Sequence, residues 1–279
     1  MQQSKLDSSP IVYYTSENKC GEWIVFLHAA FVDHKMFQSQ IEYFQGKYNI
    51  LAVDIIGHGK STDTERGDSL ANMAVWIYDI MKAEKIDKAH IAGVSLGAVL
   101  AQDFANRYPE SVNSLACFGG YDINNFDEKM QKKNSASQML MMLRAFVSIK
   151  WFAKANKKIS AFSTQAQNDF YNMNIQFPKK SFLYLASLGS MVNVFQTKQR
   201  TYPLLIGCGE FDIPGERKEV ERWKSREPQA KVVVFENAGH CVNMDVPRKF
   251  NEVMEEFWAD HKRCQSNDRQ EQPPEFLEL

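Results

Sequence analysis

The segment His-Ile-Ala-Gly-Val-Ser-Leu-Gly at 90–97 joins an apolar, β-branched run to a stretch with helical periodicity. Its last five residues, Gly93-Val94-Ser95-Leu96-Gly97, have the pattern G-x-S-x-G. A tight turn from strand to helix leaves no room for Cβ atoms beside the serine, so small residues flank it and its Oγ is exposed. The helix dipole and free N–H groups there favour developing negative charge. The segment predicts a nucleophile at Ser95, against the simpler interpretation of a Gly/Ser turn.

Short β-branched and aromatic runs like the one before Ser95 recur along the chain and predict strands. They lie at 11–15, 23–27, 49–54, 90–94, 115–118, 204–207 and 232–235. Helix-length amphipathic segments separate the middle runs, such as 70–84, whose apolar residues are spaced for one helical face. Because parallel strands need crossover connections, this alternation predicts an α/β fold, a mostly parallel central sheet with helices on both faces.

The alternation stops between about 121 and 200, where the sequence is rich in Met, Phe, Lys, Asn and Gln and shows no convincing strand. We interpret 121–200 as a helical cap, or lid, inserted into a core formed by 1–120 and 201–263. A final amphipathic helix is predicted over 247–262. The polar tail at 264–279, which holds two prolines, is predicted to be disordered.

An amphipathic helix is predicted at 139–153, within the cap. Its apolar face includes Met139, Met142, Leu143, Phe146 and Ile149. This face can pack onto the core, or it can line an adaptable apolar pocket over the predicted nucleophile. A third interpretation is attachment of this basic stretch to anionic lipid.

Overall charge and composition argue against several classes of function. Lysine and arginine number 33 against 34 acidic residues, a formal net charge of -1, so no chain-wide positive field favours nucleic acid as a partner. The longest uncharged stretch, 181–197, is polar, and the N-terminus lacks the apolar core of a signal peptide. We therefore expect no transmembrane segment and a cytoplasmic location. Five scattered cysteines without a C-x-x-C pair predict reduced thiols.

A serine hydroxyl is a weak nucleophile unless a base takes its proton, and an acid must hold that base in one orientation. His240 follows the run at 232–235 and precedes the final helix, which places it on a loop at the carboxyl edge of the sheet. Asp212 follows the preceding run, at 204–207, and is the predicted acid. Glu210 could take the place of Asp212, and Asp122, which follows the run at 115–118, is a further candidate.

Four motifs in this order resemble the α/β-hydrolase-fold superfamily, of the capped serine esterase type, over about 11–262. They are His28-Ala-Ala-Phe31, Asp54-Ile-Ile-Gly-His-Gly-Lys-Ser61, the turn at Ser95, and the loops of Asp212 and His240. The resemblance implies a catalytic triad of Ser95, Asp212 and His240, in the chain order usual for this fold. It also implies an oxyanion hole formed by the backbone N–H groups of Ala30 and Leu96.

The sequence departs from the usual pattern of the superfamily in two places. Ala29 and Ala30 stand where at least one glycine is usual, and alanine is costly there if the loop needs a positive φ. Ile56 stands where a basic residue is common, which bears on how the second motif is anchored. In that motif, His58 is expected to shape its Gly-rich turn. Cys241 is expected to pack as a small hydrophobic residue.

The resemblance implies hydrolysis of a small or medium carboxylic ester, or a related acyl compound, through an acyl-enzyme. No H-E-x-x-H pattern occurs and no G-x-G-x-x-G follows a predicted strand, so neither a metal nor a dinucleotide cofactor is expected. The expected partner is a small-molecule acyl substrate, with a second copy of the chain, in a homodimer, as a further candidate. The same constellation also serves acyltransferases, lactonases and carbon–carbon bond hydrolases. The competing hypothesis is a non-hydrolytic protein that only binds a ligand in this fold.

Overall fold

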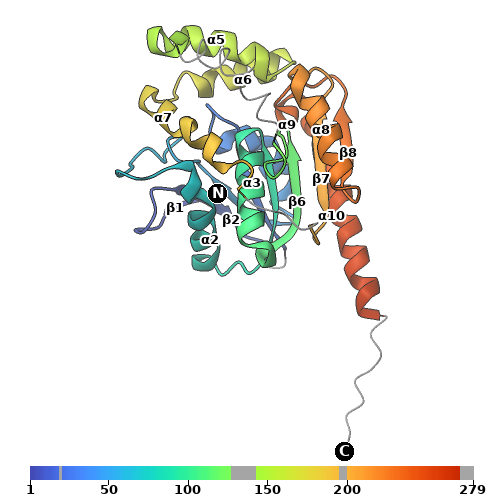
Figure 1. The fold of residues 1–279 in the computed structure, drawn as a ribbon. Helices are drawn as coiled ribbons and strands as arrows, with labels where there is room; N and C mark the ends of the chain where they lie inside the picture. The colour runs from blue at the N-terminus through green and yellow to red at the C-terminus, as the bar shows by residue number, and fades with distance from the viewer. Residues whose placement is uncertain (19–20, 127–142, 195–199, 271–279) are drawn as a thin grey trace, which may run out of the picture.

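A central sheet of eight strands organises the fold (Figure 1). The computed structural model describes residues 1–18, 21–126, 143–194 and 200–270. In sheet order the strands are β1 (Gln2–Lys5), β2 (Val12–Ser16), β4 (Asn49–Val53), β3 (Trp23–Leu27), β5 (Ala89–Val94), β6 (Val112–Phe118), β7 (Leu204–Gly209) and β8 (Lys231–Phe235). β2 is antiparallel to β1 and to β4, whereas every neighbouring pair from β4 to β8 is parallel. The mostly parallel sheet predicted from the sequence is confirmed.

The central strands are buried on both faces, as expected for strands with near-continuous apolar sequence. All residues of β4 and β5 are buried, and β3 is buried from Ile24 onward. The register pairs Leu27 with both Val53 and Gly93, which aligns the ends of β4, β3 and β5. The loops after these strands therefore leave the sheet at the same edge, where Ser95 lies.

Helices cover both faces of the sheet, as predicted, and each face has its own hydrophobic cluster. α2 (Met73–Ala83), α3 (Leu96–Arg107) and α8 (Pro214–Arg226) pack on one face, through side chains such as Ile77, Phe104 and Trp223. α1 (Gln38–Phe44) and α10 (Pro247–Gln270) pack on the other, through Phe44 and Trp258 among others. Short 3-10 helices adjoin these elements: η1 (His34–Phe37), η2 (Leu70–Asn72) and η3 (Pro109–Ser111). The helix predicted at 70–84 corresponds to η2 and α2.

The chain between β6 and β7 contains helices and no strand in the part of it that the structure describes. These are α5 (Ile149–Ser160), α6 (Thr164–Asn174), η4 (Lys179–Ser181), α7 (Phe182–Leu185) and η5 (Ala186–Met191). The end of α5 lies on the loop between β8 and α9 (Val242–Asp245), because the Cys241 N–H donates to the Ser160 carbonyl at 2.7 Å. Figure 1 shows α5 and α6 as a layer across one end of the sheet. The assignment of 121–200 as one inserted cap stays a prediction.

The helix predicted at 139–153 is interrupted at Ser148, in the part of it that the structure describes. Residues 143–147 are helical, and the Ser148 side chain then accepts from the Trp151 N–H and starts α5 as its N-cap. This break changes which residues face inward, so Phe152 is buried while Leu143 and Phe146 are 57% and 65% exposed. The expectation that Leu143 and Phe146 pack onto the core is therefore wrong.

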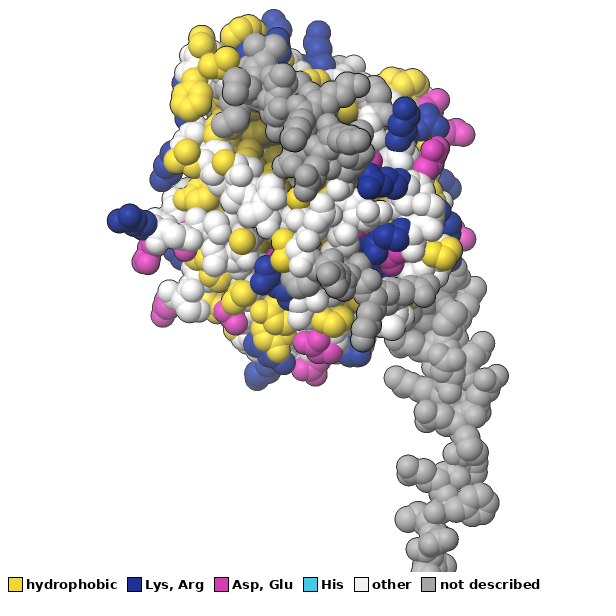
Figure 2. Space-filling model, viewed as in Figure 1, with side chains coloured by type: hydrophobic (Ala, Val, Ile, Leu, Met, Phe, Trp, Pro, Cys, Tyr) yellow, Lys and Arg dark blue, Asp and Glu magenta, His cyan; other side chains and the backbone are white. Residues whose placement is uncertain are grey.

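Hydrophobic side chains accordingly appear on the surface at this end of the molecule, as Figure 2 shows. Met139 and Met142, which the sequence analysis assigned to the same helix face, lie outside the described residues. The expectation of a Met- and Phe-lined pocket over the nucleophile thus stays a prediction.

The C-terminal helix is longer than predicted. α10 runs to Gln270 rather than to 262, so the first part of the tail predicted to be disordered, 264–270, is helical. No glycine or proline lies between 248 and 272, and the sequence therefore holds no residue that would stop the helix earlier. Residues 271–279 lie outside the described residues. Across the described chain, no helix combines the length and the apolar character needed to cross a membrane.

Candidate active site

Ser95 lies at the turn between β5 and α3, with a backbone conformation that few residues adopt. Its φ of +55° and ψ of -114° are strained for a residue with a Cβ, and two flanking glycines make the turn possible. A Cβ on Gly93 would overlap the Gly97 carbonyl, and a Cβ on Gly97 would overlap the Leu27 carbonyl. The Ser95 N–H donates to the Phe118 carbonyl at 2.8 Å, which ties the turn to β6. These contacts hold Ser95 at the N-terminus of α3, at the carboxyl edge of the sheet.

His240 lies between Ser95 and Asp212 and contacts both. Its Nε2 is 2.8 Å from Ser95 Oγ, and its Nδ1 is 2.7 Å from Asp212 Oδ1. The Ile213 N–H also donates to Asp212 Oδ1, at 2.7 Å, and this fixes the carboxylate. With a proton on Nδ1, the ring donates to Asp212 and accepts from the Ser95 hydroxyl. The three residues lie on loops that follow β5, β7 and β8, which leave the sheet at the same carboxyl edge.

The other two candidate acids lie elsewhere. Asp122 is buried and forms an ion pair with Arg226 of α8. Glu210 is exposed, and its carboxylate accepts from a backbone N–H of the loop that leads to His240. Of the three carboxylates considered from the sequence, Asp212 is the one that contacts the His240 ring.

Charges around His240 determine its protonation. Burial by itself lowers the pKa of His240, but the charge and hydrogen bond of Asp212, together with the charge of Glu216, raise it to about 9. Glu216 lies in the first turn of α8, and its Oε2 is buried without a hydrogen-bond partner among the described residues. Burial raises the pKa of Glu216 to about 7, and Asp212 and Glu219 add to this rise against the attraction of His240.

Sequence reasoning missed Glu216. The segment that forms α8, PGERKEVERWKSR, is highly charged, and such a segment is typical of a solvated helix. The nearest signal in the sequence is position, since Glu216 follows the candidate acid Asp212 by one helical turn.

The loop after β3 contains the first motif, and hydrogen bonds of His28 hold it. His28 is fully buried, its Nδ1 donates to the Ala29 carbonyl at 2.7 Å, and its Nε2 accepts from the Ile55 N–H at 2.9 Å. Burial lowers the pKa of His28, so this ring is neutral. The positive φ in the loop falls on Phe31, at +71°, and not on Ala29 or Ala30. The two alanines that replace the usual glycine are therefore free of backbone strain.

Two backbone N–H groups beside the nucleophile turn are free. Leu96 is the first residue of α3, where the N–H has no partner within the helix. Within the described part of the chain, neither the Leu96 N–H nor the Ala30 N–H has an acceptor at hydrogen-bond distance. The tight contact of Gly97 with the Leu27 carbonyl brings the end of β3, and so the loop of Ala30, next to the start of α3.

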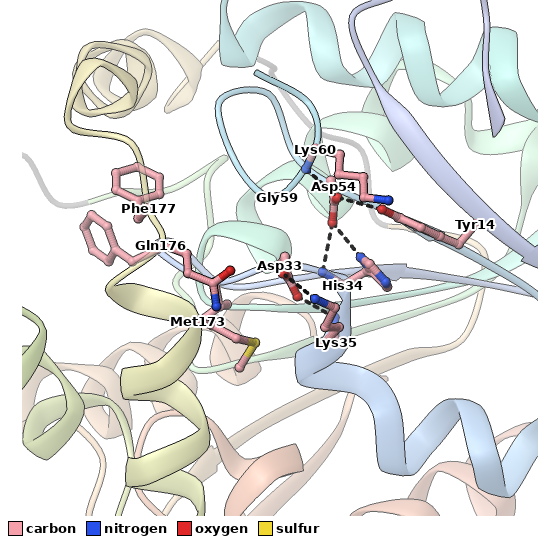
Figure 3. A pocket seen from close by; sticks show the side chains of 12 residues that line it. Tyr14, Asp33, His34, Lys35, Asp54, Gly59, Lys60, Met173, Gln176 and Phe177 are labelled. Atoms are coloured by element: carbon pink, nitrogen blue, oxygen red, sulfur yellow. Dashed lines mark hydrogen bonds and ion pairs between the residues drawn. The ribbon is translucent and has the colours of Figure 1, made fainter. Parts of the chain in front are cut away.

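Asp54 anchors the second motif without a basic residue at position 56. Asp54 Oδ1 accepts from the His34 N–H at 3.1 Å and pairs with His34 Nδ1 at 2.7 Å (Figure 3). Asp54 Oδ2 accepts from the Tyr14 hydroxyl at 3.2 Å and from the Lys60 N–H at 2.8 Å. His58, in the same motif, is buried and bonds the Ile56 carbonyl, and burial lowers its pKa to about 3. His58 therefore contributes to the shape of the turn and stays neutral.

A pocket of about 310 Å³ opens beside Asp54, as Figure 3 shows. It lies between the loop of Asp54, the η1 residues His34 and Lys35, and the residues around Phe177 that follow α6. Its lining includes neither Ser95 nor His240, so this pocket is separate from the candidate triad.

Hydrogen bonds connect the loop of His240 to the end of α5 and to the residues that follow it. The Cys241 N–H donates to the Ser160 carbonyl, and Asp245 accepts from the N–H groups of Phe162 and Ser163 at 2.7 to 3.0 Å. Burial raises the pKa of the Cys241 thiol, which packs as a small neutral side chain. Among the described residues, no three His, Cys, Asp or Glu side chains are grouped so that they could hold a metal ion.

Comparisons with known proteins agree with this architecture. A family model described as alpha/beta hydrolase fold matches residues 22–148. An (E)-2-((N-methylformamido)methylene)succinate hydrolase of Acinetobacter baylyi is 22% identical over 90% of this chain and 95% of its own length. A protein of Bacillus subtilis named as an uncharacterized carboxylesterase is 26% identical over 84% of this chain and 78% of its own length. The solved structure of a thermophilic esterase from Thermogutta terrifontis is similar with a TM-score of 0.76 and 17% identity, and it covers 94% of this chain and 99% of that chain.

The family model and the solved structure match overlapping parts of the chain. The family model begins at the first residues of β3 and continues past β6, so it includes the turn of Ser95. The structural similarity covers 94% of this chain, well beyond the residues that the family model matches. The chain therefore has the α/β-hydrolase fold, and the two relatives that match most of its length are named as a hydrolase and a carboxylesterase.

Proposed function

We propose that the protein is a serine hydrolase that cleaves a small or medium carboxylic ester, or a related acyl compound, through an acyl-enzyme. In this proposal Ser95 is the nucleophile, His240 is the general base and acid, and Asp212 orients His240. The observation that carries the proposal is the unbroken chain of short contacts from Asp212 Oδ1 through both ring nitrogens of His240 to Ser95 Oγ. A structural serine has no need of a base and an acid in this order.

The first half of the reaction forms the acyl-enzyme. Ser95 Oγ attacks the substrate carbonyl carbon while His240 Nε2 takes the hydroxyl proton, and the carbonyl oxygen becomes an oxyanion. The Ala30 and Leu96 N–H groups donate to that oxyanion, each contributing about 3 kcal/mol to transition-state stabilisation. The tetrahedral intermediate then collapses, and His240 gives its proton to the departing alcohol.

The second half releases the acid. Water attacks the acyl carbonyl while His240 Nε2 takes one of its protons, and the same two N–H groups stabilise the second oxyanion. Collapse breaks the bond to Ser95 Oγ, which regains its proton from His240. Asp212 keeps its hydrogen bond to His240 Nδ1 and stabilises the imidazolium that forms twice in each cycle.

Two relatives support the ester class. The Bacillus subtilis relative carries the name carboxylesterase, and the Thermogutta terrifontis structure is an esterase. The Acinetobacter baylyi relative is named as the hydrolase of a substituted succinate, which supports related acyl compounds as substrates as well. We further propose that 121–200 forms the cap of this site, since α5 is bonded to the loop of His240 through Ser160 and Cys241.

Purified protein assayed against p-nitrophenyl esters of graded acyl length tests the proposal. We expect hydrolysis with a burst of p-nitrophenol, equal to the enzyme concentration, wherever acylation is faster than deacylation. The assay is run near pH 9 as well as near pH 7, because the raised pKa of His240 keeps much of the ring protonated at neutral pH.

Ser95→Ala should abolish both burst and turnover, because the attacking oxygen is gone. The matched control is Ser225→Ala on α8, whose hydroxyl contacts only the Arg222 carbonyl among the described residues. This control should retain wild-type rates. Turnover of the esters that persists in folded Ser95→Ala would refute the assignment of the nucleophile.

A further inference from the structure

The segment 143–194 differs in charge from the rest of the protein. It holds seven lysines or arginines and a single acidic residue, Asp169. Its formal charge is therefore +6, while the whole chain has a net charge of -1, so the excess of acidic residues lies elsewhere. Such separation creates a local positive field on a nearly neutral protein.

Large apolar side chains are exposed within the same segment. Phe146 is 65% exposed, Val147 is 75% exposed and Trp151 is 52% exposed, beside the exposed Leu143. Tryptophan is a costly residue to leave in water. Three of the other tryptophans, Trp76, Trp223 and Trp258, are buried in the core. Exposed apolar residues that cluster in one place mark a surface that contacts something apolar.

The basic and apolar side chains lie on α5 and on the helical residues 143–147 that precede it. Lys150, Lys154 and Lys158 recur every four residues along the exposed side of α5, where Trp151 is exposed beside Lys150. Val147 is exposed as well, just before the break at Ser148. The opposite side of the helix is buried. We name the α5 face the set formed by the partly buried Arg144 and by seven exposed residues, Leu143, Phe146, Val147, Lys150, Trp151, Lys154 and Lys158.

Contacts keep the basic and apolar members of the α5 face together. The Arg144 guanidinium lies 5.4 Å from the centre of the Trp151 ring, and Lys179 Nζ donates to the Phe146 carbonyl at 2.8 Å. Lys150, Lys154 and Lys158 form no ion pair with an acidic side chain in the described part of the chain. Figure 2 shows hydrophobic and basic side chains side by side at this end of the molecule.

We propose that the α5 face docks the protein on an anionic lipid surface, lying in the interface without crossing the bilayer. A helix with lysines around tryptophan, phenylalanine and aliphatic side chains buries the apolar ones at the acyl boundary while the ammonium groups meet the headgroups. Tryptophan is favoured at this depth, where its ring is part apolar and part wet. A nucleic acid or an acidic peptide would satisfy the lysines but would leave Val147 and Leu143 in water, and therefore it fits the face less well.

Docking would bring the candidate active site to the membrane. The same helix ends at Ser160, whose carbonyl accepts from Cys241 next to His240. The docking proposal does not rest on the proposed hydrolysis, because charge and exposed apolar area alone determine attachment.

Sedimentation with vesicles tests the proposal. Vesicles of ether-linked phosphatidylcholine, with or without ether-linked phosphatidylglycerol, carry no carboxylic ester bond, so the result is independent of the proposed function. We expect the full chain to bind the anionic vesicles and not the neutral ones, with binding that weakens as salt is added. A blue shift of tryptophan fluorescence on binding should disappear in Trp151→Phe.

Two paired variants separate the charge from the apolar side chains. Lys150→Glu/Lys154→Glu should weaken binding at least about tenfold, since each basic side chain near the surface contributes appreciably. Lys82→Glu/Lys88→Glu makes the same change of charge at exposed positions around the end of α2 and should bind like the wild type. Val147→Ser/Trp151→Ser should weaken binding about tenfold by loss of apolar burial.

Three results would overturn the proposal. The first is wild-type protein that stays in solution with anionic vesicles. The second is equal loss of binding in the control pair Lys82→Glu/Lys88→Glu, which would mean that net charge alone is sensed. The third is unchanged binding of Val147→Ser/Trp151→Ser, which would identify the face as a site for polyanions rather than for a lipid surface.

Discussion

Replacing Glu216 by glutamine should change the pH at which the protein becomes active. Glu216 and Asp212 together raise the pKa of His240 to about 9, and at pH 7 a base with that pKa is neutral in only about 1% of molecules. Glu216→Gln keeps the shape of the side chain and removes its charge. Because Glu216 is the weakest of the influences that raise the pKa, its removal should lower the pKa of His240 by at most about one unit.

The rate effect follows from the fraction of neutral His240. If the pKa falls from about 9 to about 8, the neutral fraction at pH 8, where Glu216 with its pKa of about 7 is mostly ionised, rises from about 10% to about 50%, and kcat/KM at pH 8 rises by up to about fivefold. Above about pH 10 the ring is neutral in both proteins, and the rates converge. The variant should therefore be faster than the wild type at about pH 8 and equal to it above about pH 10.

The assay is the pH profile of kcat/KM for a p-nitrophenyl ester between about pH 6 and pH 10. Glu221→Gln, which removes an exposed carboxylate from the same helix, is the matched control. It should leave the acid limb, the rise of kcat/KM on the low-pH side of the profile, at the same pH as in the wild type. A merely structural role of Glu216 would lower the whole profile without moving it. An acid limb of Glu216→Gln that stays in place, or moves to higher pH, would refute the electrostatic reasoning.

Three further predictions concern the triad and the nucleophile turn. Asp212→Asn should reduce kcat by about four orders of magnitude in a folded protein, because an amide neither fixes the tautomer of His240 nor stabilises its cation; Asp122→Asn should retain the rate and lose only about 1 to 3 kcal/mol of unfolding free energy, measured in urea. Gly97→Ala should cost more than about 3 kcal/mol, or prevent folding, since its Cβ would overlap the carbonyl of Leu27, and a thermal midpoint close to wild type would contradict this. The pKa of His240 is raised in the folded state, so the cation adds stability that is fully present below about pH 6.5 and is lost as the pH rises through about 9. The difference in unfolding free energy between wild type and His240→Gln should therefore shrink over that range. A constant difference would argue against a raised pKa.

The candidate site could be predicted from the sequence because each member follows a visible apolar strand. Ser95, Asp212 and His240 come directly after β5, β7 and β8, and the carboxyl ends of parallel strands meet at one edge. A motif and a strand order were thus enough to place three loops near each other. Their catalytic roles stay proposals until the variants are measured.

Features that depend on tertiary context could not be predicted. β1, Gln2–Lys5, is polar and mostly exposed, since it lies at the edge of the sheet, and its sequence holds no β-branched or aromatic residue. Ser148 interrupts the predicted helix because its side chain caps α5, whereas its neighbours have a continuous helical pattern. Burial of a charged residue such as Glu216 depends on packing between distant segments, which local periodicity does not report.

Covalent labelling of Ser95 by a fluorophosphonate probe tests the central claim most directly. Only a serine activated by a base reacts readily with such a probe, so we expect the intact mass of the wild type to rise by one phosphonyl group near pH 9, where about half of the His240 rings are neutral. Peptide mapping should place the adduct on Ser95, and labelling should disappear in His240→Ala. Folded wild-type protein that stays unlabelled under these conditions, or labelling on Ser95 that persists at the same rate in His240→Ala, would contradict the account.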